Sequence, residues 1–316
     1  MEYRKLGNSG LRVSQLSFGS WVTFGKQMDV NPVKECLKYA FDHGVNFFDN
    51  AEVYAAGQSE TIMAEAFQQI GLSRNEYVLT TKFFWGIEDR VNFKNTLNRK
   101  YLMQAIDHSL KRLKTSFVDV AYCHRYDPET PIEEICFAMD QMIRDGKALY
   151  WGTSEWPATA IDQAYDFAVT NGLHRPIVEQ PQYNLLEKDK VEKEFAPLYK
   201  KMKLGLTTWS PLASGQLTGK YLNGIPQDSR ANLSSMGWIK DEVMNPNHVA
   251  KVQKLKNISD QSGISMTHLA LGWCTLNPNV STVILGASRL EQLKTNLEVL
   301  SKLNQIRDLK KELDAI

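Results

Sequence analysis

Short apolar runs alternate with amphipathic stretches along almost the whole chain. Successive runs begin about 30 residues apart, which is the length of one strand–helix unit. The runs predict eight strands, which cover residues 16–18, 45–48, 78–81, 118–123, 149–152, 177–179, 205–209 and 282–285. Their near-continuous apolar content is typical of strands that are buried on both faces of a parallel sheet.

The stretches between these runs have the periodicity of amphipathic helices. Residues 32–43 carry an apolar stripe that includes Val33, Leu37 and Ala40, and Gly44 follows as a stop signal. Similar patterns predict further helices over residues 60–70, 100–113, 131–144, 161–170 and 188–202.

Eight strand–helix units are enough to close a parallel sheet into a barrel, which removes both exposed edges. We therefore expect one α/β domain over residues 1–316, a (β/α)₈ TIM barrel. An open doubly wound sheet is the alternative. It is disfavoured because no G-x-G-x-x-G motif follows the first predicted strand.

Two segments fall outside the repeat. Residues 1–14 read as a β-hairpin, with a turn at residues 7–10, that covers the bottom of the barrel. Residues 211–247 form a long segment rich in Gly, Pro, Ser and Asn, which predicts a loop after the seventh strand. Loops of this length in a compact domain are usually functional, and a lid is the common case.

Composition limits the possible partners and the compartment. The 37 Lys and Arg residues nearly balance the 36 Asp and Glu residues, which argues against nucleic acid or an anionic membrane as a partner. The four cysteines show neither C-x-x-C nor metal-ligand spacing, so we expect buried thiols and no metal site. No apolar run is long enough to be a signal core or a membrane span, so we expect a cytoplasmic protein.

Polar residues stand at the ends of the predicted strands. The second, third and fourth strands end at Asp49, Lys82 and His124, and Tyr54 follows Asp49 in the next loop. The fifth, sixth and seventh strands end near Ser154, Glu155, Gln180 and Trp209. Because the carboxyl ends of barrel strands meet on one face, these residues predict a catalytic pocket there.

Each of these residues alone also has an ordinary structural interpretation, as a cap, a surface charge or a pocket-rim aromatic. Their joint occurrence favours chemistry. A free tyrosine has a pKa near 10. An ammonium such as Lys82 beside Tyr54 would lower that pKa, and a buried ammonium needs a carboxylate such as Asp49. A neutral His124 would orient a carbonyl oxygen, and a cofactor would have to supply any hydride.

Several of these segments resemble a known family. Residues 48–54 (FDNAEVY), 80–82 (TTK) and 119–124 (DVAYCH) are similar to the aldo-keto reductase signature. Residues 150–156 (YWGTSEW) and 208–213 (TWSPLA), among others, resemble the voltage-gated potassium-channel β-subunit branch. The resemblance implies a catalytic tetrad in which Tyr54 donates the proton and Asp49, Lys82 and His124 assist.

The same resemblance implies a nicotinamide cofactor site. Ser154 and Gln180 would hold the carboxamide, Trp209 would stack on the nicotinamide ring, and Asp49 would lie beside it. The remaining residues implied to contact the cofactor are Trp21, Gln27, Ser210, Pro211, Leu212, Ser214, Lys220, Arg230, Gly286, Ser288, Gln292 and Asn296. Since a 2′-phosphate prefers cationic partners, Lys220, Arg230 and Arg289 favour NADP(H) over NAD(H), although Arg289 also reads as a surface charge.

Two departures from the family pattern bear on function. Glu155 stands where many aldo-keto reductases have an asparagine that contacts the carboxamide, and a carboxylate there needs its desolvation compensated. His124 stands where the animal channel β-subunits have asparagine, which favours turnover. Trp85, Trp156 and Trp238 either narrow the pocket or serve packing.

The preferred hypothesis is therefore an NADP(H)-dependent reduction of aldehydes or ketones in a pocket formed by Trp21, Tyr54, Trp85 and His124. A first alternative is a regulatory subunit that binds NADP(H) with little turnover. The branch resemblance implies a homotetramer and a channel partner for it. A second alternative is an aldolase or lyase that forms a Schiff base on Lys82, which an adjacent Asp49 disfavours.

Overall fold

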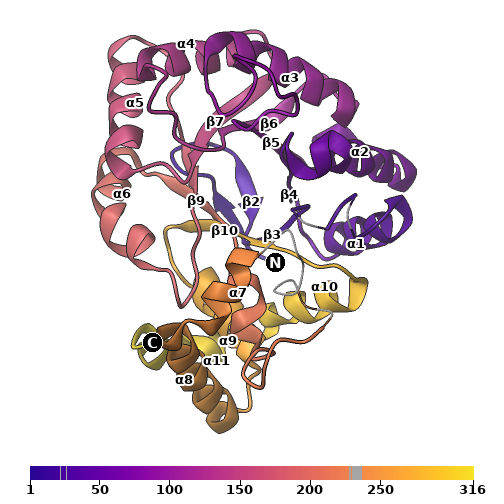
Figure 1. Cartoon of the computed structure of the whole chain (residues 1–316), viewed down its shortest axis with the longest axis vertical. Coiled ribbons are helices and arrows are strands. Elements are labelled where there is room, and N and C mark those ends of the chain that lie inside the picture. Colours follow the sequence, from indigo (N-terminus) through magenta and orange to yellow (C-terminus); the bar gives the residue numbers. More distant parts are fainter. Residues whose placement is uncertain (22, 26, 228, 230–236) are drawn as a thin grey trace.

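Eight parallel strands close into a barrel, in the order β10-β3-β4-β5-β6-β7-β8-β9. The structure is a computed structural model and describes residues 1–21, 23–25, 27–227, 229 and 237–316. In Figure 1 the strands lie at the centre and helices α1 to α6 surround them. The strands are β3 (Leu16–Gly19), β4 (Phe47–Asp49), β5 (Val78–Phe83), β6 (Val118–Cys123), β7 (Ala148–Ser154), β8 (Val178–Gln180), β9 (Gly205–Thr208) and β10 (Val280–Leu285). The predicted TIM-barrel fold is confirmed, and each predicted strand overlaps an observed one.

The first five crossover helices follow the predicted pattern. Their bounds are α1 (Val30–Asp42), α2 (Gln58–Ile70), α3 (Arg99–Leu113), α4 (Ile132–Arg144) and α5 (Ala158–Thr170). Helix α1 buries Val33, Leu37 and Ala40, so its apolar stripe faces the barrel as expected. The predicted continuous helix over 188–202 is wrong. A π-helical turn, η3 (Lys190–Glu194), is followed by α6 (Ala196–Met202), because Pro197 has no N–H to continue the hydrogen-bond ladder.

The N-terminal hairpin closes the bottom of the barrel, as predicted. Strands β1 (Tyr3–Lys5) and β2 (Arg12–Ser14) pair antiparallel. Gly7 lies in the turn between them with φ of 56°, and a Cβ there would collide with the Ile177 carbonyl oxygen. The hairpin therefore packs directly against the amino ends of β8 and β9.

The segment after β9 is less irregular than the sequence suggested. Within residues 211–247, Ala213–Thr218 form the 3₁₀ helix η4 and Gly237–Met244 form α7. The long connection predicted after the seventh strand is present, with these two short helices within it, and the lid role stays a prediction. The remaining elements are α8 (Pro246–Ser262), α9 (Met266–Thr275), α10 (Leu290–Leu297), η7 (Glu298–Lys302), α11 (Leu303–Asp308) and α12 (Lys310–Asp314).

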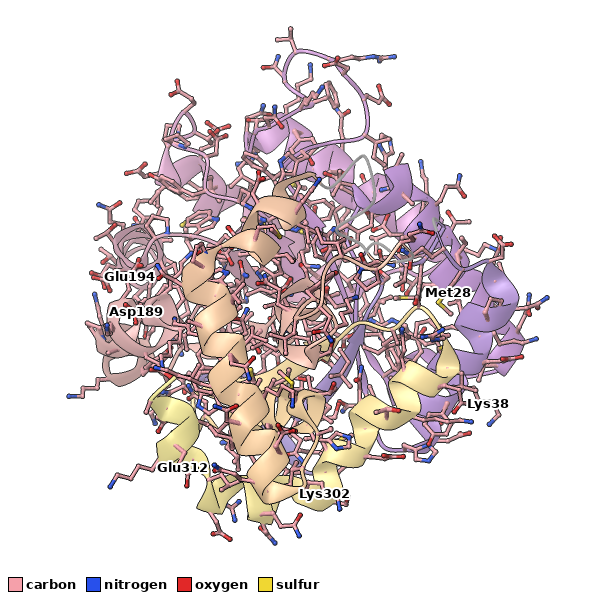
Figure 2. All side chains as sticks on the ribbon, turned by 60° about the horizontal axis from the view of Figure 1, so that its bottom comes forward. Met28, Lys38, Asp189, Glu194, Lys302 and Glu312 are labelled. Carbon is pink, nitrogen blue, oxygen red and sulfur yellow. The ribbon has the colours of Figure 1, made fainter. Side chains whose placement is uncertain are left out.

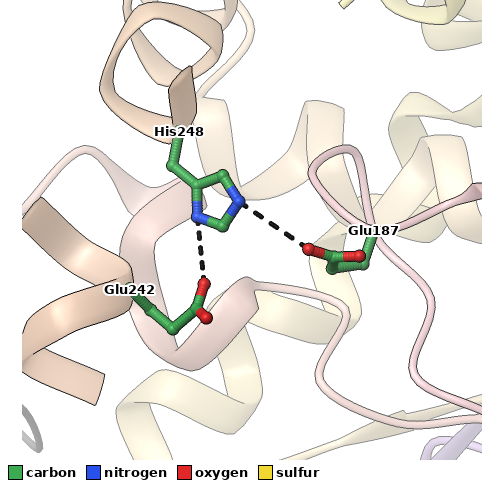
Figure 3. Close-up of side chains that lie close together, drawn as sticks. All are labelled: Glu187, Glu242 and His248. Atoms are coloured by element: carbon green, nitrogen blue, oxygen red, sulfur yellow. Dashed lines mark ion pairs between the residues drawn. The ribbon is translucent and has the colours of Figure 1, made fainter. Parts of the chain in front are cut away.

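A histidine ties α7 and α8 to the loop after β8. His248 Nδ1 lies 3.3 Å from Glu242 Oε2, and its Nε2 lies 3.7 Å from Glu187 Oε1 (Figure 3). Each carboxylate faces a different ring nitrogen, whereas metal ligands converge on one point. The contact therefore acts as a double ion pair whenever the imidazole is protonated.

Most of the apolar core of the described residues falls into two layers, and a small third cluster contains Ile239 and Val243. One cluster fills the lower barrel interior and includes Phe47, Val78, Val120 and Val178, and a larger one lies between the barrel and the helices. Charged side chains such as Lys38 and Glu312 lie at the periphery in Figure 2. All four cysteines are buried free thiols, as expected. Within the described residues, no helix combines the length and the apolar content needed to cross a membrane.

Candidate active site

Strand alternation places four polar side chains inside the barrel at its carboxyl end. Phe47, Val78 and Val178 belong to the interior cluster. Successive side chains on a strand point to opposite faces, so Asp49, Thr80, Lys82 and Gln180, at even spacings from these residues, share the interior face. All four of these side chains are buried.

Lys82 and Asp49 form a buried ion pair at the centre of this group. The Lys82 ammonium, whose side chain is 0% exposed, lies 2.6 Å from Asp49 Oδ2 and donates to the Asn50 carbonyl oxygen at 2.7 Å. Asp49 Oδ1 accepts hydrogen bonds from Thr80 Oγ1 at 2.8 Å and Gln180 Nε2 at 3.0 Å. Both charges are thus desolvated and fully hydrogen-bonded, which is the condition under which a buried pair is tolerated.

Tyr54 reaches this pair from a short turn. It begins the 3₁₀ turn η1 (Tyr54–Gly57), in which Ala55 and Ala56 both have positive φ. Lys82 Nζ donates to Tyr54 Oη at 3.3 Å and lies 4.9 Å from the centre of its ring. The strained turn therefore holds the phenol oxygen at the ammonium.

The expected lowering of the Tyr54 pKa is wrong. Burial, and then the Asp49 carboxylate, raise the pKa of Tyr54 well above its ordinary value. Asp49 offsets the positive charge of Lys82, whose own pKa is lowered by burial against the opposing effect of Asp49. Tyr54 is therefore a neutral phenol at neutral pH, which is the protonation state of a proton donor.

His124 lies beside Tyr54 and is neutral, as expected. The ring centres of His124 and Tyr54 are 5.8 Å apart. The ring centres of His124 and Trp85 are 4.5 Å apart, and these two rings pack edge to face. Burial, and then the Lys82 and Arg125 charges, lower the pKa of His124 well below its ordinary value. Its buried Nδ1 has no hydrogen-bond partner among the residues described, so the protein does not stabilise a second proton on the ring.

These residues line a cavity of about 300 Å³. Among the described residues, seven of the predicted site residues contribute to its wall: Trp21, Tyr54, Trp85, His124, Ser154, Gln180 and Trp209. The other described lining residues, which were not predicted, are Phe24, Val53, Ala55 and Arg125. Arg125 directly follows His124, so reading one residue further past the fourth strand would have identified it.

Other predicted positions lie away from the cavity wall. Trp156 is fully buried and packs on Tyr126 at 5.2 Å, so it serves packing and does not narrow the pocket. Gln27 is exposed and is not part of the lining. Arg230 and the side chain of Trp238 lie outside the described residues.

Glu155 holds Trp209 in place. Its Oε1 accepts hydrogen bonds from Trp209 Nε1 at 2.9 Å and Gln182 N at 2.5 Å, and Lys190 donates to Oε2 at 2.7 Å. Burial would raise the pKa of Glu155, but Lys190 and these hydrogen bonds bring it below its ordinary value. Protein groups therefore compensate the desolvation of the Glu155 carboxylate. The backbone of Glu155 has a positive φ of 57°.

The loop after β9 forms a strained turn beside a lysine. Ser210, Ala213, Ser214 and Gly215 all have positive φ, and Ser214 N donates to Ser210 Oγ at 3.3 Å. The N–H groups of Ala213 and Gly215 also donate within the turn, to the carbonyl oxygens of Ser210 and Leu212, both at 2.9 Å. A Cβ on Gly215 would lie 2.8 Å from the Lys220 ammonium, so that cation packs against the loop.

A separate group of predicted residues surrounds the start of α10. Gln292 Oε1 accepts from both Ser288 N at 2.9 Å and Ser288 Oγ at 3.1 Å, and Asn296 is buried one turn further on. Gly286 and Arg289 are exposed, and Arg289 precedes the first residue of α10. An exposed Arg289 at this position agrees with both alternatives that the sequence allowed, so its role toward a 2′-phosphate stays a prediction.

Comparison with known proteins identifies close relatives. The Aldo/keto reductase family model matches residues 15–313. A probable voltage-gated potassium channel subunit beta of Oryza sativa subsp. japonica is 51% identical over 301 residues, which are 95% of this chain and 91% of that protein. Another of that description from Arabidopsis thaliana is 51% identical over 299 residues, or 94% and 90%. A putative voltage-gated potassium channel subunit beta of Schizosaccharomyces pombe is 43% identical over 319 residues, or 99% and 92%.

Proposed function

Because this chain belongs to the aldo/keto reductase family, we propose that it reduces aldehydes or ketones to alcohols with NADPH and with Tyr54 as the proton donor. The observation that carries the proposal is the cavity in which a neutral phenol and a neutral imidazole lie together above a buried Lys82–Asp49 pair. Carbonyl reduction requires a proton donor and polar groups that stabilise the charge that develops on the carbonyl oxygen. This cavity offers both kinds of group.

The residues present fit a nicotinamide dinucleotide. Ser154 and Gln180 line the cavity, and Trp209 offers an aromatic face that Glu155 holds still. The Lys220 ammonium, which packs against the strained turn after β9, favours NADP(H) over NAD(H), because a 2′-phosphate prefers a cationic partner. When bound, the cofactor would supply a hydride to the carbonyl carbon.

The protein's own residues would donate the proton, stabilise the resulting phenolate and orient the carbonyl oxygen. Tyr54 Oη would give its proton to the carbonyl oxygen, which becomes the alcohol hydroxyl. The Lys82 ammonium, 3.3 Å from Tyr54 Oη, would stabilise the phenolate left behind, and Asp49 keeps that ammonium charged. His124, being neutral, would hydrogen-bond the carbonyl oxygen without competing as an acid.

The test is Tyr54→Phe, with NADPH oxidation by 4-nitrobenzaldehyde as the assay. We expect the variant to bind NADPH about as tightly as the wild type and to lose a factor on the order of 10²–10⁴ in rate. Tyr3→Phe is the matched control, since it removes a hydroxyl from the hairpin at the opposite end of the barrel. Unchanged activity in Tyr54→Phe would refute the assignment.

A second candidate function is a cofactor-binding regulatory subunit, and the names of the relatives favour it. In that case the chain would assemble with a channel, and a homotetramer would be the expected form. The two functions differ in turnover. Oxidation that stops after one equivalent of NADPH would favour the regulatory subunit, and many equivalents would favour the reductase.

The aldolase alternative has little support. A Schiff base requires a neutral amine with a free electron pair. The Lys82 ammonium instead donates to Asp49, to the Asn50 carbonyl and to Tyr54. Failure of borohydride to trap an adduct on Lys82 is the expected result.

A further inference from the structure

Arg125 is a fixed cation in the wall of the cavity. Its Nη1 donates to the His124 carbonyl oxygen at 2.5 Å, and its guanidinium carbon lies 4.7 Å from the centre of the Trp85 ring. These two contacts orient the guanidinium next to Tyr54 and His124, which line the same cavity. Stacking on an aromatic face leaves the edge of the guanidinium, with its N–H donors, free for a ligand.

The protein does not supply a partner for this charge. In the part of the chain that the structure describes, no carboxylate forms an ion pair with Arg125. The carboxylates that raise the pKa of Arg125 through space are those of Glu155 and Glu179. Glu155 is engaged by Lys190 and Trp209, and Glu179 by Thr153.

The rest of the cavity wall leaves the positive charge uncompensated. Among the described residues that line the cavity there is no Asp or Glu, and His124 is neutral. Lys82 is balanced by Asp49 below the cavity floor. Burial lowers the pKa of Arg125, yet a guanidinium remains protonated in proteins. A partly buried charge without a partner is costly, so an anion bound here would gain a strong charge-assisted hydrogen bond.

We propose that Arg125 binds an anionic group of the substrate, a carboxylate, so that this site favours oxo acids over neutral carbonyl compounds. The proposal rests on the proposed function, whose substrate class it names. The aromatic walls formed by Trp21, Trp85 and Trp209 suit the carbon skeleton that joins the carboxylate to the carbonyl. The carbonyl would lie at Tyr54 and His124, and the carboxylate would accept from the free N–H groups of Arg125.

Two aldehydes of nearly the same shape test this directly. 4-Carboxybenzaldehyde is anionic at neutral pH and 4-nitrobenzaldehyde is neutral, while both carry a planar two-oxygen group opposite the aldehyde. We expect Arg125→Met to lower the kcat/KM ratio of the carboxy to the nitro compound by about 30-fold, equivalent to ~2 kcal/mol for a charge-assisted hydrogen bond, with KM for the carboxy compound carrying most of the change.

Two further variants separate charge from structure. Arg125→Lys retains a positive charge without the planar fork, so its ratio should fall between those of the wild type and Arg125→Met. Arg12→Met makes the same charge change on the exposed hairpin at the far end of the barrel, and its ratio should match the wild type. A ratio unchanged in Arg125→Met, or equal loss for both aldehydes, would overturn the proposal and leave only a structural role for Arg125.

A binding measurement keeps this test separate from the proposed function. Benzoate binding to the NADP⁺-loaded protein, measured by calorimetry, requires no turnover. We expect at least a 10-fold weaker Kd in Arg125→Met than in the wild type. If the wild type reduces neither aldehyde but benzoate binding depends on Arg125, the reductase fails and the anion site stands. If both aldehydes are reduced and the Kd of benzoate is the same in Arg125→Met as in the wild type, the anion-site proposal fails and the reductase proposal stands.

Discussion

Replacing Asp49 with asparagine should expose the cost of an unbalanced charge beneath the cavity. Asp49 neutralises the Lys82 ammonium at 2.6 Å, and the Lys82 side chain is 0% exposed. Asparagine keeps the shape of the side chain and can still accept a hydrogen bond from Thr80. The substitution therefore removes the negative charge that balances Lys82 and leaves the packing of the side chain nearly unchanged. Breaking one partner of a buried ion pair costs about 3–5 kcal/mol, and we expect Asp49→Asn to lose about that much stability.

The loss should depend on pH in a defined direction. The pKa of Lys82 is lowered by burial and raised by Asp49, so it falls further when the carboxylate is removed. An unfolded lysine titrates near 10.4. Between the lowered folded pKa and that value the unfolded chain binds more protons, so the stability of the variant rises with pH. The difference from the wild type should shrink as the pH is raised from about 7 to about 9.5.

Urea unfolding followed by circular dichroism at several pH values measures both effects. Asp42→Asn is the matched control, because Asp42 pairs with Lys38 at 2.8 Å on the surface of α1, with its side chain 47% exposed. Surface pairs contribute about 0–1 kcal/mol, so this variant should differ little from the wild type at any pH. A loss in Asp49→Asn no larger than in Asp42→Asn, or one that does not change with pH, would refute the electrostatic reasoning.

Three further predictions follow from the site. Because the pKa of His124 lies well below its ordinary value, kcat should show no step near pH 6.5, and a wild-type step that His124→Asn abolishes would contradict this. Glu155→Ala should weaken NADPH binding about 10-fold because it releases Trp209, and Glu155→Gln should weaken it less because one acceptor oxygen remains. Equal Kd values for NADPH in the wild type and both variants, measured by fluorescence titration, would show that Trp209 needs no support. Gly86→Ala should lower the Tm by several degrees more than Gly146→Ala, since both glycines have positive φ but only a Cβ on Gly86 meets the Phe93 carbonyl oxygen; equal Tm shifts would contradict the collision.

The barrel and the central group of the site were predictable because both depend on strand periodicity. Eight apolar runs set the number of strands, and the carboxyl ends of parallel strands meet on one face. Asp49, Lys82 and Gln180 were therefore expected together, and in the structure Lys82 and Gln180 both donate hydrogen bonds to Asp49.

What could not be predicted depends on local conformation and on competing energies. Glu155 accepts a hydrogen bond from Trp209 Nε1 and has a positive φ, and the amino-acid sequence alone does not reveal that backbone conformation. The direction in which the pKa of Tyr54 shifts depends on the balance between burial, the Asp49 carboxylate and nearby cations. That balance can be judged only when the distances between these groups are known. Helix α9 carries no apolar stripe, since His268–Thr275 are all buried, so periodicity could not mark it.

Deuterium transfer tests the central claim most directly. Wild-type protein would be mixed with NADPH carrying deuterium at the transferable C4 position and with excess 4-nitrobenzaldehyde, and the alcohol analysed by mass spectrometry. The proposed function predicts many equivalents of 4-nitrobenzyl alcohol per protein chain, each with one deuterium on the carbinol carbon. Alcohol without deuterium, or no alcohol beyond the first equivalent, would contradict reduction in this cavity.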